Sequence, residues 1–344
     1  MDTRNRRAFL LGAFGTIAVF AVLLFVVGAR RVVDSLLSAD PSLVAVTFAL
    51  AICWLAAWSL MLRTVLVTLG VTIPVAKAFF VYSGAVFANN VTPFGQAGGE
   101  PVAALLISKV SDSRYETGLV GIASVDVLNV VPSISLIFVG VAYYATTAAI
   151  GERLETAVSS AVVLISAVVL VIGLIWRYHG TIIDRLPAIV APRLERLGLE
   201  RLGLERFDSQ TLEADLADRL QRFFENIERV AVDRWRLVAV VGLSLAGWLF
   251  QTAALMAAFA ALGYSVPPYV LLFVIPLANL AGAAPLPGGL GGIEAAFVTL
   301  LVPTTGVEAS AVTAAVLIFR GAIYWMPVLI GGVSVSAFGV RTLR

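Results

Sequence analysis

Apolar residues occur along this chain in long runs separated by short polar segments, and this pattern predicts membrane-spanning helices. A helix needs about 20 mainly apolar residues to cross the hydrocarbon core of a bilayer. Six runs approach or exceed that length, and we predict one crossing for each. The six predicted crossings are 8–28, 43–62, 118–147, 158–176, 237–262 and 309–338.

Two further apolar stretches are interrupted where a membrane helix would normally continue. The first divides into 78–91 and 102–108, and the second into 269–284 and 293–302. At ~1.5 Å per residue, the 14 residues of 78–91 reach roughly 21 Å, less than the ~30 Å of the hydrocarbon core. Short segments interrupted by glycine and proline are typical of half-helices in re-entrant hairpins. We therefore predict two such hairpins.

The two interruptions share one arrangement of residues. In each, a proline is followed by glycine at the second and fifth positions and by glutamate at the seventh. The segments 93–100 and 287–294 therefore superpose with a single offset of 194 residues. Glycine permits positive φ angles and close backbone approach, and proline ends a half-helix. The positions predicted to shape the breaks are Pro93, Gly95, Gly98, Gly99, Pro287, Gly289 and Gly292.

The same offset relates the crossings to one another. Adding 194 to 43–62 gives 237–256, which lies inside the fifth crossing. Adding it to 118–147 gives 312–341, which is close to the sixth. Each half then holds three crossings and one hairpin, and an odd number of crossings inverts the second half relative to the first.

This repeat defines the predicted architecture. We expect an all-α polytopic membrane protein with six transmembrane helices and two re-entrant half-helix hairpins arranged as inverted repeats. Residues 1–344 form a single transmembrane domain, with 1–147 as the first repeat and 157–344 as the second. Broken helices of such repeats meet near the middle of the membrane in many transporters.

Two charged residues inside the crossings obey the offset as well. Asp126 and Arg320 differ by 194 positions and have opposite signs. Because a charge at the bilayer centre costs at least ~2.5–3.5 kcal/mol, each side chain should face the protein interior and find a partner. We expect Asp126 and Arg320 to pair with each other, with Glu294 or with Glu100.

Polar residues at the two breaks complete a candidate site for a lipid head group or an ion. Glu100 and Glu294 fall near the start of a half-helix, where they either cap the helix or act in binding and gating. Both roles stay open at this point. The candidate binding or gating residues are Glu100, Glu294, Arg320, Asp126, Asn89, Asn90, Gln96 and Asn279.

The segment 177–234 differs from the rest of the chain because it holds 10 arginines and 11 acidic residues. Within it, apolar residues from Leu212 to Val230 recur at spacings of three and four, which predicts an amphipathic helix. We predict a cytoplasmic loop whose helix rests on the membrane or the helix bundle. Docking of a partner protein is the alternative.

Composition agrees with a membrane protein and excludes several other classes. Hydrophobic residues make up 60% of the chain and charged residues 13%, with a mean hydropathy of +0.95. The net charge of +2 is too small and too scattered to indicate nucleic-acid binding. The single cysteine, Cys53, and the single histidine, His179, exclude an internal disulfide and two-imidazole chemistry. We predict no cofactor, no metal and no catalytic constellation.

The distribution of basic residues predicts the orientation. With both breaks folded as hairpins and the N-terminus inside, only Arg30, Arg31 and Arg153 face outward. Ten basic residues outside the long loop, and the ten arginines within it, then face the cytoplasm. We therefore expect a multi-pass protein of the cell membrane with both termini cytoplasmic.

The motifs at the breaks resemble those of a known family, the lysylphosphatidylglycerol synthase transmembrane region, also called the flippase-like domain. The resemblance rests on Asn89-Asn-x-Thr-Pro-Phe-Gly-x-x-Gly-Gly-Glu100, on Pro287-Gly-Gly-x-Gly-x-x-Glu294 and on the helix that carries Phe-Arg320. It covers essentially the whole chain and implies movement of lipids between leaflets, in some members of an aminoacylated phospholipid.

Two differences from the family pattern affect this expectation. The aminoacyl-transferase domain fused to the lysyl-lipid enzymes is missing from these residues, so we expect a stand-alone member that does not aminoacylate. Family members often carry Arg-x-x-Asp in the third crossing, whereas this chain has Asp126-x-x-Asn129, which leaves the partner of Arg320 undetermined.

The resulting functional hypothesis is an integral membrane lipid translocase. Its expected partner is a membrane lipid, either an anionic phospholipid or a polyprenyl-phosphate-linked lipid. One alternative is a non-transporting accessory subunit of an envelope-lipid or glycan enzyme. Another is a membrane-embedded enzyme that modifies lipids. The sequence does not predict the oligomeric state.

Overall fold

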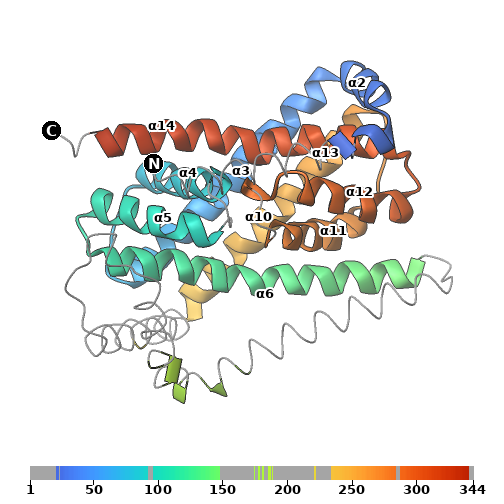
Figure 1. The fold of residues 1–344 in the computed structure, drawn as a ribbon. Coiled ribbons are helices and arrows are strands. Elements are labelled where there is room, and N and C mark those ends of the chain that lie inside the picture. Colours follow the sequence, from blue (N-terminus) through green and yellow to red (C-terminus); the bar gives the residue numbers. More distant parts are fainter. Residues whose placement is uncertain are drawn as a thin grey trace. The chain divides into compact units, whose positions relative to one another are not determined.

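A computed structural model gives the fold of the chain (Figure 1). It describes residues 21–91 except 23, then 96–147, 234–283 and 287–340, together with single positions between 174 and 221. Every regular element in these residues is a helix. Most of the predicted crossing 8–28 lies outside the described residues. The same is true of nearly all of 158–176, of His179, and of the amphipathic pattern from Leu212 to Val230.

Four helices in the described residues are long and apolar enough to cross a membrane. They confirm four of the six predicted crossings and make the chain an integral membrane protein. The fourth of them contains a π-helix, η4, between two α-helices. These elements are α3 (Pro41–Thr68), α6 (Tyr115–Thr147), α10 (Arg234–Ala261), and α13 (Ala309–Arg320) followed by η4 (Gly321–Trp325) and α14 (Met326–Val340).

Local chemistry fixes where α3 begins, two residues before the predicted crossing. The Asp40 carboxylate accepts hydrogen bonds from the backbone N–H of Ser42 at 2.7 Å and from the Ser42 hydroxyl at 2.6 Å. Pro41 occupies the first helical position, where its missing N–H leaves no hydrogen bond unmade. A capped start of this kind stabilises the end of a long apolar helix.

A short helix that the hydropathy pattern did not predict, α2 (Ala29–Leu37), precedes α3. It contains Arg30 and Arg31, and it packs against α13. Because only one side of α2 is apolar, a search for continuous apolar runs does not detect it.

Each predicted break separates two shorter helices that pack against each other. α4 (Val75–Val91) packs on α5 (Gln96–Ser111), and α11 (Pro268–Leu280) packs on α12 (Gly292–Thr305). Two short 3₁₀ segments, η2 (Ala281–Ala283) and η3 (Pro287–Gly289), lie in the second break. The four short helices therefore form two helical pairs, as the interrupted hydrophobic pattern predicts.

The break positions are only partly as predicted. Gly98 and Gly99 lie inside α5, which begins at Gln96, so the prediction that they interrupt the helix is wrong. Gly99 instead allows close approach, because a Cβ atom there would lie 2.6 Å from the backbone nitrogen of Asn89. Pro93 and Gly95 lie outside the described residues.

In the second break, glycines take the backbone conformations expected of them. Gly288, Gly289 and Gly291 have φ angles of 57°, 64° and 86°. Gly292 is the first residue of α12, and Pro287 is the first of η3. The positive φ angles turn the chain sharply between α11 and α12.

Equivalent helices start at nearly constant intervals along the chain. α3 and α10 each contain 28 residues and begin at 41 and 234. α4 and α11 begin at 75 and 268, and α6 and α13 begin at 115 and 309. The offset found between the two Gly/Pro motifs therefore also relates the helix starts.

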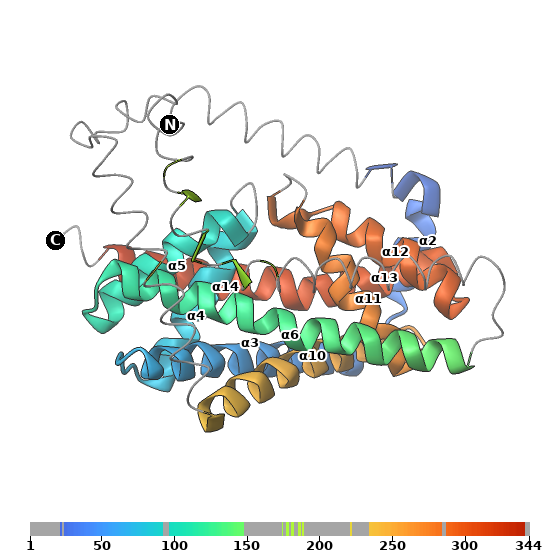
Figure 2. The same ribbon diagram turned by 90° about the horizontal axis from the view of Figure 1, so that it is seen from below.

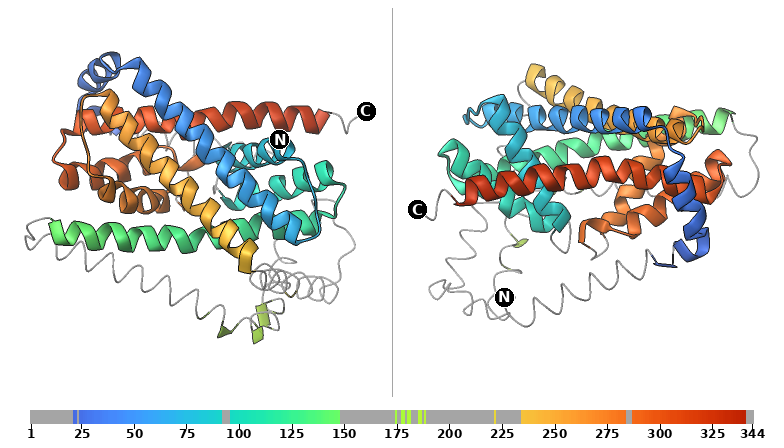
Figure 3. Two further views of the ribbon diagram at one scale, coloured as in Figure 1. Left: turned by 180° about the vertical axis from the view of Figure 1, so that it is seen from behind. Right: turned by 90° about the horizontal axis from the view of Figure 1, so that it is seen from above.

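The equivalent helices α3 and α10 run in opposite directions (Figure 3). The start of α3 meets the end of α10 through a bond of 2.8 Å from the Asp40 N–H to the Ala261 carbonyl. Further along, Trp58 Nε1 donates to the Ser244 carbonyl at 3.2 Å. Repeats of opposite orientation would make equivalent helices antiparallel, as α3 and α10 are.

The contacts of the short helices with the long ones also correspond between the two halves of the chain. α4 packs against α14, and its equivalent α11 packs against α6. α6 also lies along α5, so this long helix contacts short helices from both breaks (Figure 2). The contacts between helices therefore place the two breaks in one bundle.

Candidate functional site

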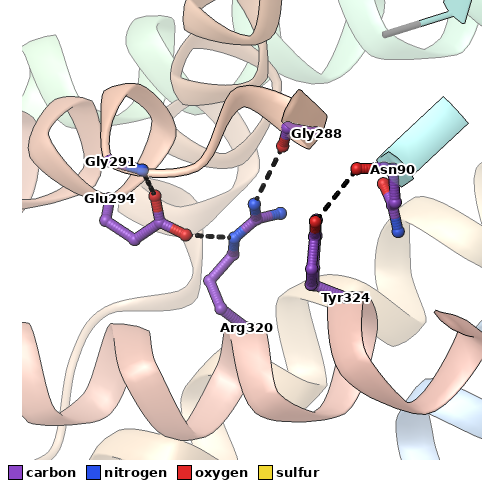
Figure 4. A network of polar contacts seen from close by, with 6 residues as sticks. All are labelled: Asn90, Gly288, Gly291, Glu294, Arg320 and Tyr324. Carbon is purple, nitrogen blue, oxygen red and sulfur yellow. Dashed lines mark hydrogen bonds and ion pairs between the residues drawn. The ribbon is translucent and has the colours of Figure 1, made fainter. Parts of the chain in front are cut away.

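A buried ion pair joins the start of α12, just after the second break, to the end of α13 (Figure 4). Arg320 Nε, at the end of α13, donates to Glu294 Oε1 at 2.7 Å. The exposed fractions of Glu294 and Arg320 are 1% and 7%. A charge-assisted bond in a site that excludes water holds both side chains in place. The structure thus identifies Glu294 as the partner of Arg320.

Glu294 also caps its helix. Its second oxygen, Oε2, accepts the backbone N–H of Gly291 at 2.6 Å, and Glu294 is the third residue of α12. This contact is one half of a capping box. Capping and charge pairing, which the sequence presents as alternatives, therefore use different oxygens of one carboxylate.

The Arg320 guanidinium makes two further contacts. One Nη atom donates to the Gly288 carbonyl at 3.2 Å. The centre of the group lies 4.8 Å from the centroid of the Tyr324 ring, within the range of a cation–π contact. The remaining Nη1 atom makes no hydrogen bond to the described residues. Arg320 thus keeps hydrogen-bond donors available for a ligand.

Tyr324 links this site to the first break. Its hydroxyl donates to the Asn90 carbonyl at 3.0 Å, near the end of α4. Gly288 lies at the same point, because a Cβ atom there would be 2.8 Å from the Asn90 carbonyl oxygen. The two breaks, nearly 200 residues apart in sequence, therefore touch within the described part of the chain.

The first half contains a second pair at the equivalent positions. Glu100, on α5, and Asp126, on α6, lie close enough for their carboxyl groups to interact with each other. Tyr82, on α4, is buried and lies close enough to Asp126 to interact with it electrostatically. Asp126 and Arg320 thus find the two glutamates that the sequence proposed, and they do not pair with each other.

Two oxygen atoms near this carboxyl pair lack partners. Asp126 Oδ2 and Asn89 Oδ1 are buried and make no hydrogen bond within the described part of the chain. Asn89 lies against Gly99, next to Glu100 in the sequence. Buried acceptors without donors are rare in native proteins, so each needs an explanation.

The position at which the chain departs from the family pattern has a structural role. Asn129 Oδ1 accepts hydrogen bonds from the Ser244 hydroxyl and from Trp248 Nε1, the latter at 3.0 Å. Trp248 also stacks edge-on against Trp58 at 5.4 Å. Asn129 therefore ties α6 to α10 and α3, and Arg320 does not depend on it.

Other candidate residues contribute less. Asn90 joins the site through its backbone carbonyl, not its side chain, because the Tyr324 hydroxyl bonds that atom. Asn279 is half-buried near the end of α11. The side chain of Gln96 lies outside the described residues.

Sequence reasoning missed Tyr324 and Tyr82. Tyr324 lies four residues after Arg320, which is one helical turn, so this spacing could have identified it. Tyr82 lies in an apolar helix and carries no comparable signal in the sequence. In the described residues, no group of three or more His, Cys, Asp or Glu side chains is arranged to hold a metal ion.

Comparison with known proteins places the chain in a family of membrane proteins. Residues 13–331 match the model described as the lysylphosphatidylglycerol synthase TM region. A UPF0104 membrane protein of Methanothermobacter thermautotrophicus is 26% identical over 97% of this chain and 94% of its own length. A UPF0104 membrane protein of Pyrococcus horikoshii is 22% identical over 96% of each chain. Glycosyltransferase AglD of Haloferax volcanii is 27% identical over 91% of this chain and 52% of its own length.

Proposed function

The chain belongs to the lysylphosphatidylglycerol synthase TM region family, and from this premise we propose that it moves a lipid between the two leaflets of a membrane. The proposal depends most on the buried Arg320, whose Nη1 atom is available beside two contacting breaks. The lipid carries a phosphate in its head group, either as an anionic phospholipid or as a polyprenyl phosphate.

Phosphate recognition follows from the state of the guanidinium. Arginine is always charged and binds phosphate oxygens through several donors at once. Glu294 and Gly288 hold two donor atoms of Arg320 and fix the orientation of the group. A phosphate at Nη1 would then bind without the entropy cost of ordering a long side chain.

The proposed architecture is that of a transporter with inverted repeats. Six crossings, counting 8–28 and 158–176, enclose two re-entrant hairpins that enter from opposite faces. Both termini lie in the cytoplasm, as the distribution of basic residues favours. The antiparallel pair of α3 and α10 and the contact between the breaks support this arrangement.

The test is lipid movement in liposomes that contain purified protein and lipids labelled in one leaflet. We expect Arg320→Ala and Glu294→Gln to slow movement at least tenfold. Arg31→Ala is the matched control, because Arg31 pairs with Glu308 on the surface, where their side chains are 74% and 58% exposed. Equal rates for Arg320→Ala and Arg31→Ala would refute the proposal.

A second candidate is an accessory role beside a glycan or envelope-lipid enzyme. The similarity to AglD favours it, because this chain corresponds to about half of a protein named as a glycosyltransferase. An accessory subunit would leave every labelled lipid in place, including phosphatidylglycerol and a polyprenyl phosphate. The liposome experiment therefore separates the two candidates.

A further inference from the structure

The Tyr324 hydroxyl lies where the first break meets the Arg320 site. It donates to the Asn90 carbonyl at 3.0 Å, and it would lie 2.9 Å from a Cβ atom at Gly288. The Gly288 carbonyl in turn accepts Arg320 Nη2 at 3.2 Å. Figure 4 shows the remaining guanidinium nitrogen, Nη1, on the side that faces Tyr324 and Asn90. A ligand that binds Nη1 therefore arrives beside the Tyr324 hydroxyl.

The hydrogen bond between Tyr324 and Asn90 is of a kind that an anion can replace. Asn90 is the second-last residue of α4, and the last four carbonyls of a helix have no partner within that helix. A neutral hydrogen bond of this type contributes little net free energy. A hydrogen bond from a hydroxyl to a charged oxygen is shorter and roughly twice as strong. An anionic oxygen beside Tyr324 therefore competes successfully with the Asn90 carbonyl.

On the premise of the lipid-binding function proposed above, we propose that the Tyr324 hydroxyl is a second donor to the lipid phosphate. When a phosphate oxygen binds Arg320 Nη1, the hydroxyl transfers its hydrogen bond from the Asn90 carbonyl to the phosphate. The hydroxyl makes one hydrogen bond before and after the exchange, so it is never left without an acceptor. Binding of the head group thereby releases the first break from the second.

The exchange requires only rotation of the hydroxyl, because the tyrosine ring is held in place. The Arg320 guanidinium lies 4.8 Å from the ring centroid, and the Trp325 ring packs edge-on at 5.1 Å. Tyr324 is buried, and it belongs to the π-helix η4. Single π turns within α-helices occur frequently at functional sites. A fixed ring keeps the hydroxyl oriented towards both acceptors, so one side chain serves the binding site and the contact between the breaks.

The rival explanation is that the Tyr324 hydroxyl only ties the two breaks together. Tyr324→Phe separates the two, because it removes the hydroxyl and keeps the ring against Arg320. A purely structural hydroxyl would lower the melting temperature of this variant and leave its affinity for lipid unchanged. A hydroxyl that binds phosphate lowers the affinity as well. Tyr264→Phe is the matched control, because Tyr264 is 37% exposed in the turn before α11.

The first measurement is the binding of two phosphate-bearing lipids to the full-length protein in detergent micelles. The probes are a short-chain phosphatidylglycerol and a polyprenyl phosphate. For each probe that binds the wild type, we expect Tyr324→Phe to raise the Kd about fivefold, since a bond to a charged acceptor is lost. Tyr264→Phe should bind as the wild type does. The melting temperature of each variant shows that it is folded.

The second measurement follows the distance between the two breaks. Val91, at the end of α4, and Thr299, on α12, are exposed, so each can be replaced by cysteine and carry a nitroxide label. Cys53→Ala removes the single native cysteine. We expect the phosphate-bearing lipid to lengthen the distance between the labels, and diacylglycerol, which has no phosphate, to leave it unchanged. In Tyr324→Phe the shift caused by the lipid should be smaller, because no bond to Asn90 remains to be broken.

Two outcomes would overturn the role of Tyr324. They are equal affinities of Tyr324→Phe and Tyr264→Phe, and an unchanged distance between the labels at saturating lipid. Arg320→Ala distinguishes this failure from a failure of the proposed function. If Arg320→Ala abolishes binding and Tyr324→Phe has no effect, the lipid-binding function stands without the exchange. If Arg320→Ala binds as tightly as Arg31→Ala, or if neither probe binds the wild type, both proposals are wrong.

Discussion

Arg320 Nε lies 2.7 Å from Glu294 Oε1, and the other oxygen of that carboxylate holds the first turn of α12. The Glu294 side chain therefore pairs with the buried Arg320 and also holds the turn at the end of the second break. Substitutions of either residue should therefore affect stability, so stability and lipid movement must be measured separately.

Replacing one partner of this ion pair should destabilise the protein more than replacing both partners. We expect Arg320→Met to lower the free energy of unfolding by about 3–5 kcal/mol, because Glu294 is left charged and buried. The double variant Arg320→Met, Glu294→Met should lose less than the single variant, since no charge then remains. Denaturation in mixed detergent micelles measures both values. A double variant less stable than the single one would contradict this account.

The contact between the breaks should depend on the absence of a side chain at Gly288. Gly288→Ala combines an unfavourable positive φ with a Cβ atom 2.8 Å from the Asn90 carbonyl oxygen. Gly306→Ala is the matched control, because Gly306 has a φ of +70° and no neighbouring atom within 4 Å of its Cβ position. The control should cost about 1–2 kcal/mol, and Gly288→Ala clearly more. Equal losses would place Gly288 away from the first break.

The Asn129 cluster should contribute to stability and not to transport. Asn129→Ala leaves the donors of Ser244 and Trp248 without their acceptor, so we expect a loss of about 1–3 kcal/mol in the free energy of unfolding. Ser135→Ala is the control, because that exposed hydroxyl bonds only its own helix at 2.9 Å. The rate of lipid movement per folded molecule should be unchanged in both. A specific loss of transport in Asn129→Ala would assign that residue to the site.

The start of α3 should become less stable in acid. Hydrogen bonds from the Ser42 side chain and backbone lower the pKa of Asp40. A lowered pKa in the folded state stabilises the protein above the ordinary carboxyl pKa, and this contribution is lost as pH falls through the lowered value. Asp40→Ala should therefore reduce the melting temperature at pH 7 and have little effect in strong acid. Asp40→Asn, an equally good cap without a charge, should remove the pH dependence instead.

Much of the fold follows from the sequence because lipid leaves few alternatives to a helix. Backbone groups in the hydrocarbon core must bond within their own segment, so apolar length alone locates α3, α6, α10 and the last crossing. The repeat was also visible in the sequence. Glycine, proline and charged residues are rare in apolar segments, so a match at four positions between the two breaks is informative.

The details that the sequence did not reveal depend on packing. Glycine is compatible with a helix, so Gly98 and Gly99 did not show that α5 begins at Gln96. Similarly, the spacing of Glu294 and Arg320 did not distinguish a helix cap from a charge pair, because one carboxylate has two oxygens. Tyr82 and Tyr324 become part of the site only through contacts between distant helices.

The π-helix directly after Arg320 has a mechanical consequence. A π turn contains one residue more than an α turn, so α14 is rotated by about 100° relative to a straight continuation of α13. This change of phase lets one crossing direct α13 towards α12 and α14 towards α4. Gly321–Trp325 thus sets the angle between the face of α13 that carries Arg320 and the face of α14 that packs on α4.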